Sequence, residues 1–164
     1  MDMQPLDVDE IRASFVNCSR GEAKSLTVPT DVPWATRDFL GWRDPKAPGR
    51  AYLVVAHRDE LIGLSLRAAP PAKSRLRSNM CGFCGTTHTL ADITLFSGRR
   101  AGKAGREGNT LGTYLCADLA CDAYVRGERR PAVPQPHESL TVEQRLERMR
   151  GKVGLFVERV LETR

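Results

Sequence analysis

Two short cysteine pairs constrain this chain more than any other feature of its sequence. Two residues separate Cys81 from Cys84, four separate Cys116 from Cys121, and thirty-one residues lie between the two pairs. Two tight turns that each present two thiolates can place four sulfur atoms at the corners of a tetrahedron, which is the coordination of a structural zinc ion. The spacing therefore predicts a Zn²⁺ site whose ligands are Cys81, Cys84, Cys116 and Cys121.

Paired cysteines also occur in redox motifs and in disulfides. A thioredoxin-like redox pair normally lies within a strand–helix–strand pattern, and no such pattern surrounds Cys81. Disulfides are typical of secreted chains, whereas residues 1–5 have neither the basic nor the apolar segment of a secretory signal. No apolar run approaches the roughly 20 residues that cross a bilayer. We therefore expect a cytoplasmic protein with reduced cysteines and no membrane partner.

Positive charge is concentrated around the cysteines. Residues 67–130 hold eleven Lys and Arg against five Asp and Glu, while the rest of the chain holds fourteen against fifteen. A basic surface attracts an acidic protein or a nucleic acid at long range and accelerates their encounter. Such charge also promotes solubility by itself, so it is consistent with a binding protein without identifying the partner.

Hydrophobic periodicity predicts a helix near each end of the chain. Asp7 and Glu10 can form a capping box before an apolar face of Val8, Ile11, Phe15 and Cys18, in which Cys18 is a small buried side chain. Ser139 or Thr141 can cap a second helix, whose apolar face is Val142, Leu146, Met149, Val153, Phe156, Val157 and Val160. Between residues 29 and 48, four prolines predict turns or a short helix around Trp34, Phe39, Leu40 and Trp42.

Two β-hairpins are predicted in the middle of the chain. Residues 51–56 and 61–66 are the strands of the first, and residues 92–96 and 109–115 are the strands of the second. The tip of the second hairpin, residues 97–108, is rich in glycine and is expected to be exposed and mobile.

A helix is predicted over residues 117–125, directly after the second hairpin. Cys116 and Cys121 would lie about 140° apart on an ideal helix, so we expect Cys116 to precede the helix and Cys121 to lie in its first turn. A cysteine turn, a hairpin and a helix that carries the last ligand together make a treble-clef zinc finger.

The expected fold class is α+β, with antiparallel β-hairpins and a treble-clef zinc finger flanked by N-terminal and C-terminal helices. The expected organisation has three parts. Residues 1–50 form an N-terminal helical segment, and residues 51–130 form a domain of β-hairpin and zinc finger. Residues 131–164 form a proline-rich connection and a C-terminal amphipathic helix.

The residues around the cysteines also resemble a known family. Cys81-Gly82-Phe83-Cys84-Gly85, His88, Leu95-Phe96 and Gly112-Thr113-Tyr114-Leu115-Cys116 with Cys121 resemble the C-terminal treble-clef finger of elongation-factor-G-binding proteins of the FusB/FusC type. Residues 13–17 and 41–45 look like actinobacterial members, so the likeness covers most of the chain. The better-studied members have a helical bundle before the finger, whereas here only a short helical stretch is expected before the first hairpin.

The resemblance implies a non-enzymatic role in translation. Family members bind elongation factor G through the zinc domain and help to release it from a ribosome stalled by fusidic acid. Hot spots of protein interfaces favour aromatic side chains and arginine, so the candidate contact residues beside the metal are Phe83, His88, Phe96, Lys103, Arg106 and Tyr114. Each has a second interpretation. The aromatic residues can be the core of the finger, the two cations can belong to a solvated loop, and His88 can be a reserve zinc ligand or can support one.

The sequence is also compatible with two further functions. The basic loop 99–106 can bind ribosomal RNA or another nucleic acid, although few aromatic residues are interleaved with the cations for base stacking. A nuclease of the HNH kind also uses a treble-clef frame but needs a catalytic histidine. Neither strand 92–96 nor the helix after Cys116 contains one, so no catalytic residue is predicted.

Overall fold

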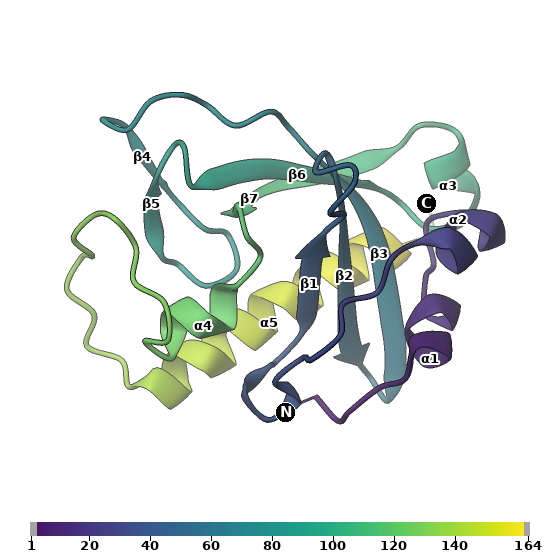
Figure 1. Ribbon diagram of the computed structural model, residues 1–164, viewed down its shortest axis with the longest axis horizontal. Coiled ribbons are helices and arrows are strands. Elements are labelled where there is room, and N and C mark those ends of the chain that lie inside the picture. The colour runs from purple at the N-terminus through teal and green to yellow at the C-terminus, as the bar shows by residue number, and fades with distance from the viewer. Residues whose placement is uncertain (1–2, 163–164) are drawn as a thin grey trace.

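A five-stranded antiparallel sheet forms the framework of the protein, which a computed structural model describes over residues 3–162. Its strands lie in the order β1, β2, β3, β6, β7, and their bounds are Leu40–Arg43, Arg50–His57, Glu60–Ala68, Ile93–Arg99 and Thr110–Cys116. A separate two-stranded sheet pairs β4, Ser78–Met80, with β5, Thr87–Thr89. Figure 1 shows β6 and β7 crossing the upper end of β1, β2 and β3, so the large sheet is strongly bent.

Both predicted hairpins are confirmed. β2 pairs with β3 from Arg50 opposite Arg67 to His57 opposite Glu60. The two residues between them, Arg58 and Asp59, have φ angles of 49° and 63°, as the type I′ turn of a two-residue hairpin requires. β6 pairs with β7 along seven residues, and the pairing of β3 with β6 joins the two hairpins into one sheet.

The strand β1 was not predicted. The expected turns are present as the 3-10 turn Trp34–Thr36 and as a turn over residues 44–50. Leu40 and Trp42, expected in a turn or short helix, instead alternate with Gly41 and Arg43 in an edge strand. Gly41 leaves room for the bend that follows Cys116, because a Cβ at this position would lie 3.0 Å from the Leu119 Cβ. Because the nearby prolines indicated turns, the sequence did not predict β1, which pairs along its full length with β2.

Within residues 3–162, five α-helices complete the fold. They are α1, Val8–Ala13; α2, Arg20–Ser25; α3, Gly102–Arg106; α4, Cys121–Val125; and α5, Val142–Leu161. The predicted capping box forms at Asp7 with Glu10. Of the two caps considered for the last helix, Thr141 is the one that forms, and Gln144 completes a capping box with it that was not predicted. The segment 97–108 is more ordered than expected, because β6 continues to Arg99 and α3 follows. α4 begins four residues later than predicted.

The helix α5 covers one face of the sheet, behind β1 to β3 in Figure 1. Its buried residues join the main core with residues of β2, β3, β6 and β7; they are Leu146, Met149, Val153, Phe156, Val157 and Val160. Val142, predicted on this face, is exposed instead. None of the helices within residues 3–162 is long and apolar enough to span a bilayer.

The N-terminal segment covers the opposite face, but only over β1 to β3. Met3, Ile11 and Leu26 pack there against Trp42 and Val54 in a second apolar cluster. Asn17 fixes the edge of this cover, since its side-chain amide donates to the carbonyls of Ser65 and Arg99 at 3.0 Å and its oxygen accepts from the Ser65 N–H at 2.7 Å. On the adjoining face of β6 and β7, Leu95 and Tyr114 remain exposed.

Candidate metal centre

The first cysteine pair lies in a tight turn between β4 and β5. The Phe83 N–H points to the Cys81 Sγ at 3.4 Å, and the Gly85 N–H donates to the Cys81 carbonyl at 3.0 Å. Gly85 has a φ of 75°, which glycine adopts without the steric penalty of a Cβ. The Gly82 N–H donates to the Tyr114 carbonyl at 2.7 Å, so the turn is fastened directly to β7.

The second pair has the irregular geometry that the five-residue spacing predicted. Cys116 ends β7, Cys121 begins α4, and between them Leu119 has a φ of 56°. The Leu119 N–H donates to the Cys116 carbonyl at 2.9 Å, and the Asp118 carboxylate accepts from the Ala120 N–H at 3.0 Å. This bend turns both sulfur atoms toward the first pair.

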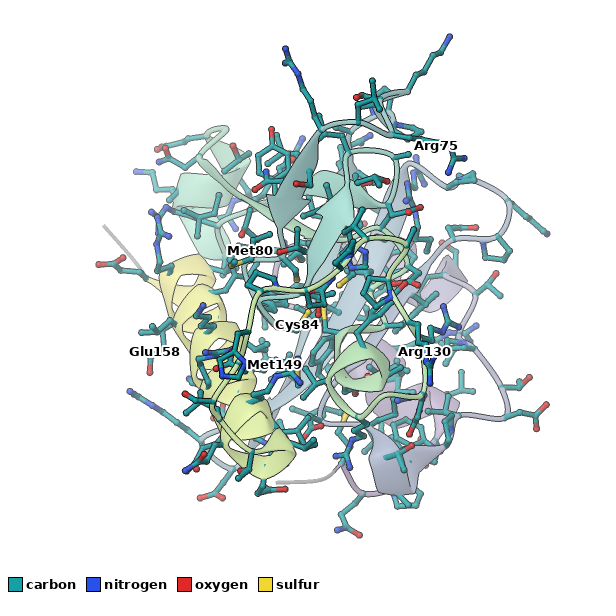
Figure 2. The ribbon with its side chains drawn as sticks, turned by 90° about the vertical axis from the view of Figure 1, so that its left-hand side faces the viewer. Arg75, Met80, Cys84, Arg130, Met149 and Glu158 are labelled. Atoms are coloured by element: carbon teal, nitrogen blue, oxygen red, sulfur yellow. The ribbon has the colours of Figure 1, made fainter. Side chains whose placement is uncertain are left out.

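The four sulfur atoms form one compact, buried cluster. All four Sγ atoms lie within 4.8 Å of one another, with 3.7 Å between Cys81 and Cys121 and 3.5 Å between Cys84 and Cys116. Zinc–sulfur bonds of about 2.3 Å in a tetrahedron place sulfur atoms about 3.8 Å apart, whereas a disulfide requires about 2.05 Å. Figure 2 shows Cys84 near the centre of the view, and Cys84 shares one buried core with Met149 of α5. The cluster is suited to a zinc ion.

Hydrogen bonds among the four thiols shift the pKa values of Cys81 and Cys121 in opposite directions. Hydrogen bonds from Cys116, Cys121 and Cys84 lower the pKa of Cys81. The hydrogen bond with Cys116, followed by those with Cys81 and Cys84, raises the pKa of Cys121. Because zinc binds thiolates, its binding must release the protons that remain on the cluster.

Polar groups around the sulfur atoms hold the cluster in place. The His88 Nε2 lies 3.2 Å from the Cys116 Sγ, and the Thr86 Oγ1 lies 3.2 Å from the Cys84 Sγ. The Tyr124 ring meets the His88 ring edge-on at a centroid distance of 4.7 Å. The Tyr124 hydroxyl donates to Asp118 at 2.8 Å, and burial followed by this hydrogen bond raises the pKa of Tyr124. His88 therefore supports a sulfur ligand, as metal sites commonly require.

Buried ion pairs tie α4 to the rest of the protein. The fully buried Asp38 carboxylate accepts from Arg150 of α5 at 2.6 Å and from Arg126 at 3.1 Å. Its backbone N–H donates at 3.0 Å to Asp122, the residue after Cys121, and Asp122 also pairs with Arg37 at 3.2 Å. Burial raises the pKa of Asp122. The metal centre is thus linked to the N-terminal segment and to α5 through charged groups as well as apolar ones.

The six predicted contact residues divide into two groups. Phe83, His88 and Phe96 are 2%, 1% and 0% exposed, so their side chains offer no surface to a partner. Phe83 packs edge-on against Phe39 and Phe156, which is the core role considered as the alternative. Tyr114, Lys103 and Arg106 are exposed, although Lys103 pairs with Glu107 at 3.8 Å.

Sequence reasoning missed several residues around the centre. Thr86, Asp118 and Tyr124 hold the ligands, yet nothing in their spacing distinguishes them from loop and helix residues. The exposed apolar residues Met80 and Leu95 were also missed. For Leu95, strict alternation with Phe96 along β6 was a usable signal, because adjacent residues of a strand point to opposite faces.

A cysteine turn, a β-hairpin and a short helix around four buried sulfur atoms define a treble-clef zinc finger. The chain belongs to the FBP C-terminal treble-clef zinc-finger family, whose sequence model matches residues 10–160 and so nearly the whole chain. The family is one of binding proteins of the elongation-factor-G-binding type and not of enzymes. No significant match was found among curated proteins or among solved structures.

Proposed function

We propose that this protein binds elongation factor G through its zinc finger, with Cys81, Cys84, Cys116 and Cys121 holding Zn²⁺. The observation that carries the proposal is the family match, which includes the finger, the sheet and most of α5. The zinc ion has a structural role here, because the four buried thiolates would complete its coordination and leave no position for a substrate.

The contact surface that we propose is the uncovered face of the finger around Tyr114. Tyr114 is 46% exposed and lies opposite Leu95 across β6 and β7. Met80, 50% exposed, ends β4, which packs beside β7. Exposed aromatic and aliphatic side chains on a rigid hairpin are typical anchors of a protein interface. Lys103 and Arg106 of α3 lie toward the other end of the hairpin and would steer an acidic partner.

Binding alone does not release a ribosome-bound factor. A binder accelerates release only if it favours the dissociating conformation of the factor over the ribosome-bound one. We propose that the protein, located in the cytoplasm, releases elongation factor G from the ribosome through this conformational preference. It predicts that adding the protein to a stalled complex of ribosome, elongation factor G and fusidic acid increases the dissociation rate of the factor.

Calorimetric titration with purified elongation factor G tests the binding step. We expect Tyr114→Ala to weaken binding by at least about tenfold, as for an interface hot spot. Leu155→Ala is the matched control, because Leu155 is 62% exposed on α5, away from the finger, and its removal should change affinity by less than about twofold. A parent protein that gives no binding heat and no co-migration with the factor would refute the proposal.

A pull-down from lysate separates this proposal from an RNA-mediated association. The lysate is divided, and one half is treated with nuclease before the pull-down. Recovery of elongation factor G from both halves supports direct binding to the factor. Recovery only from the untreated half indicates that nucleic acid carries the interaction.

A further inference from the structure

A polar cleft lies where the N-terminal segment ends over the sheet. Its lining residues include the hydroxyl residues Ser65 of β3, Ser97 of β6 and Thr110 of β7 and the arginines Arg67, Arg99 and Arg106. The cleft adjoins α2 and α3, on the right of Figure 1, whereas α4 lies on the left. No zinc ligand lines it. Its volume of about 610 Å³ is within the usual range of ligand-binding clefts.

The arginines of the cleft are available to a ligand. Within residues 3–162, the side chains of Arg67, Arg99 and Arg106 form no hydrogen bond or ion pair with another residue, in contrast to Arg100, which pairs with Glu162 at 3.6 Å. The three arginines are exposed. An arginine that is not already paired can form two parallel hydrogen bonds with one phosphate group.

The sheet sets the spacing of two of these arginines. Arg67 lies opposite Ser97, and Arg99 follows Ser97 by two residues on the same face of β6. The ladder between β3 and β6 ends at this pair, and the Asn17 side chain bridges the Ser65 and Arg99 carbonyls beyond it, so Arg67 and Arg99 lie on one face where the two strands separate. Arg67 and Arg99 can therefore contact adjacent anionic groups of one ligand at the same time.

The other groups of the cleft are compatible with an anion. The hydroxyls of Ser65, Ser97 and Thr110 form no side-chain hydrogen bond within the described part of the chain. Burial, and then the nearby Glu22 carboxylate, raises the pKa of the Cys18 thiol to about 11, so this thiol is neutral near pH 7. Glu22 is the one carboxylate among the lining residues that the structure describes, and the cationic side chains outnumber it.

We propose that this cleft binds the phosphodiester backbone of double-stranded RNA. Among the described residues that line the cleft, none is aromatic, so they offer no platform on which the bases of a single strand could stack. Arginine forks suit the phosphates, and unpaired hydroxyls suit the 2′-hydroxyl groups that distinguish RNA from DNA. The proposal does not depend on binding of elongation factor G. Arg106 borders both surfaces, but Arg67 and Arg99 line only the cleft, and Tyr114 does not line it.

Fluorescence anisotropy with a labelled RNA duplex of about 16 base pairs, the length that small double-stranded-RNA domains cover, tests the proposal. We expect Arg67→Gln/Arg99→Gln to weaken binding at least about tenfold and to reduce the salt dependence of the affinity by about two counterions. The matched control is Arg75→Gln/Arg77→Gln, which removes the same charge from two exposed arginines of the segment before β4; Figure 2 shows Arg75 at the periphery. The control should bind within about threefold of the parent.

Several results would overturn the proposal. One is the absence of RNA binding by the parent protein at low salt. Another is an equal loss in the cleft variant and the control, because nonspecific charge would then explain the binding. A DNA duplex of equal length that binds within about twofold of the RNA would refute the assignment to RNA.

The two binding functions can be separated with the same variants. Arg67→Gln/Arg99→Gln should retain affinity for elongation factor G within about twofold, while Tyr114→Ala should retain affinity for the RNA duplex. Unchanged melting temperature and zinc content establish that each variant is folded. A parent that binds RNA but not elongation factor G would refute the proposed function and leave the cleft proposal intact.

Discussion

The two halves of the large sheet differ in how many of their faces are buried. In β2, the neighbouring residues Leu53 and Val54 are both fully buried, because α5 covers one face and the N-terminal segment covers the other. In β6, Phe96 is fully buried but its neighbour Leu95 is 37% exposed. The half with two covered faces is a scaffold, and the half with one covered face holds the metal centre and presents the open surface.

Loss of the metal should affect the second half most. We expect Cys84→Ser to remove about 5 kcal/mol or more of stability, since structural zinc contributes folding free energy directly. For a chain of this size the melting temperature should fall by more than about 10 °C. Hydrogen exchange should show β7 losing protection before β2. Cys18→Ser is the control, and an unchanged melting curve for Cys84→Ser would contradict a structural metal.

Alanine substitutions at neighbouring positions test the difference in burial directly. Phe96→Ala should cost about 3–5 kcal/mol, whereas Leu95→Ala should cost less than about 1 kcal/mol. In β2, Leu53→Ala and Val54→Ala should both cost about 2 kcal/mol or more, because both faces are packed. Urea denaturation measures all four. Similar costs for Leu95→Ala and Phe96→Ala would show that the outer face of β6 is covered in solution.

The reactivity of the Cys18 thiol tests how firmly the N-terminal segment covers the sheet, because Cys18 lies near β3 and β6, where the two halves meet. Its pKa of about 11, raised by burial and then by Glu22, predicts alkylation by iodoacetamide about a hundredfold slower near pH 7.5 than for a thiol of pKa 9, because only the thiolate reacts. The rate should rise about tenfold per pH unit up to about pH 10. Mass spectrometry follows the modification, with Cys18→Ser as the control. A rate that levels off near pH 9 would mean that the N-terminal cover opens readily.

The ion pairs at Asp38 connect the two halves. Asp38→Asn keeps the shape of the side chain but removes the charge that faces Arg126 and Arg150. Because both arginines are partly exposed, we expect a loss of about 2 kcal/mol, below the range for a fully buried pair. Denaturation by urea measures it, with Glu143→Gln on the exposed side of Arg150 as control. An equal effect of the two substitutions would show that burial of Asp38 adds nothing.

The sequence predicted correctly those elements whose form is determined by their own residues. The cluster of four cysteines, both hairpins and the caps of α1 and α5 follow from spacing, alternation and end residues. β1 and α3 were not predicted, because contacts with neighbouring segments stabilise them although their own residues do not favour a strand or a helix. In α3, Gly105 packs against the backbone of Arg100, and a Cβ would collide with the Arg100 carbonyl, so a residue that disfavours helices is required by the tertiary contact.

The predicted contact residues could not be divided into buried and exposed ones from the sequence, for a related reason. Phe83, Phe96 and Tyr114 are all aromatic residues near cysteines, and alternation shows only that Phe96 and Leu95 face opposite sides. Which side is covered depends on α5, which follows Leu95 by more than forty residues. The burial of His88 likewise follows from the Tyr124 ring, which α4 brings against it.

The position of α5 limits how this protein can be divided. Its buried side chains share one core with strands on both sides of the bend and with the cysteine cluster itself. A fragment that ends before residue 131 would lose the back wall of the sheet and expose the underside of the cysteine turn. Grafting the metal-binding motif onto another protein should therefore succeed only if the last helix is carried along as its foundation.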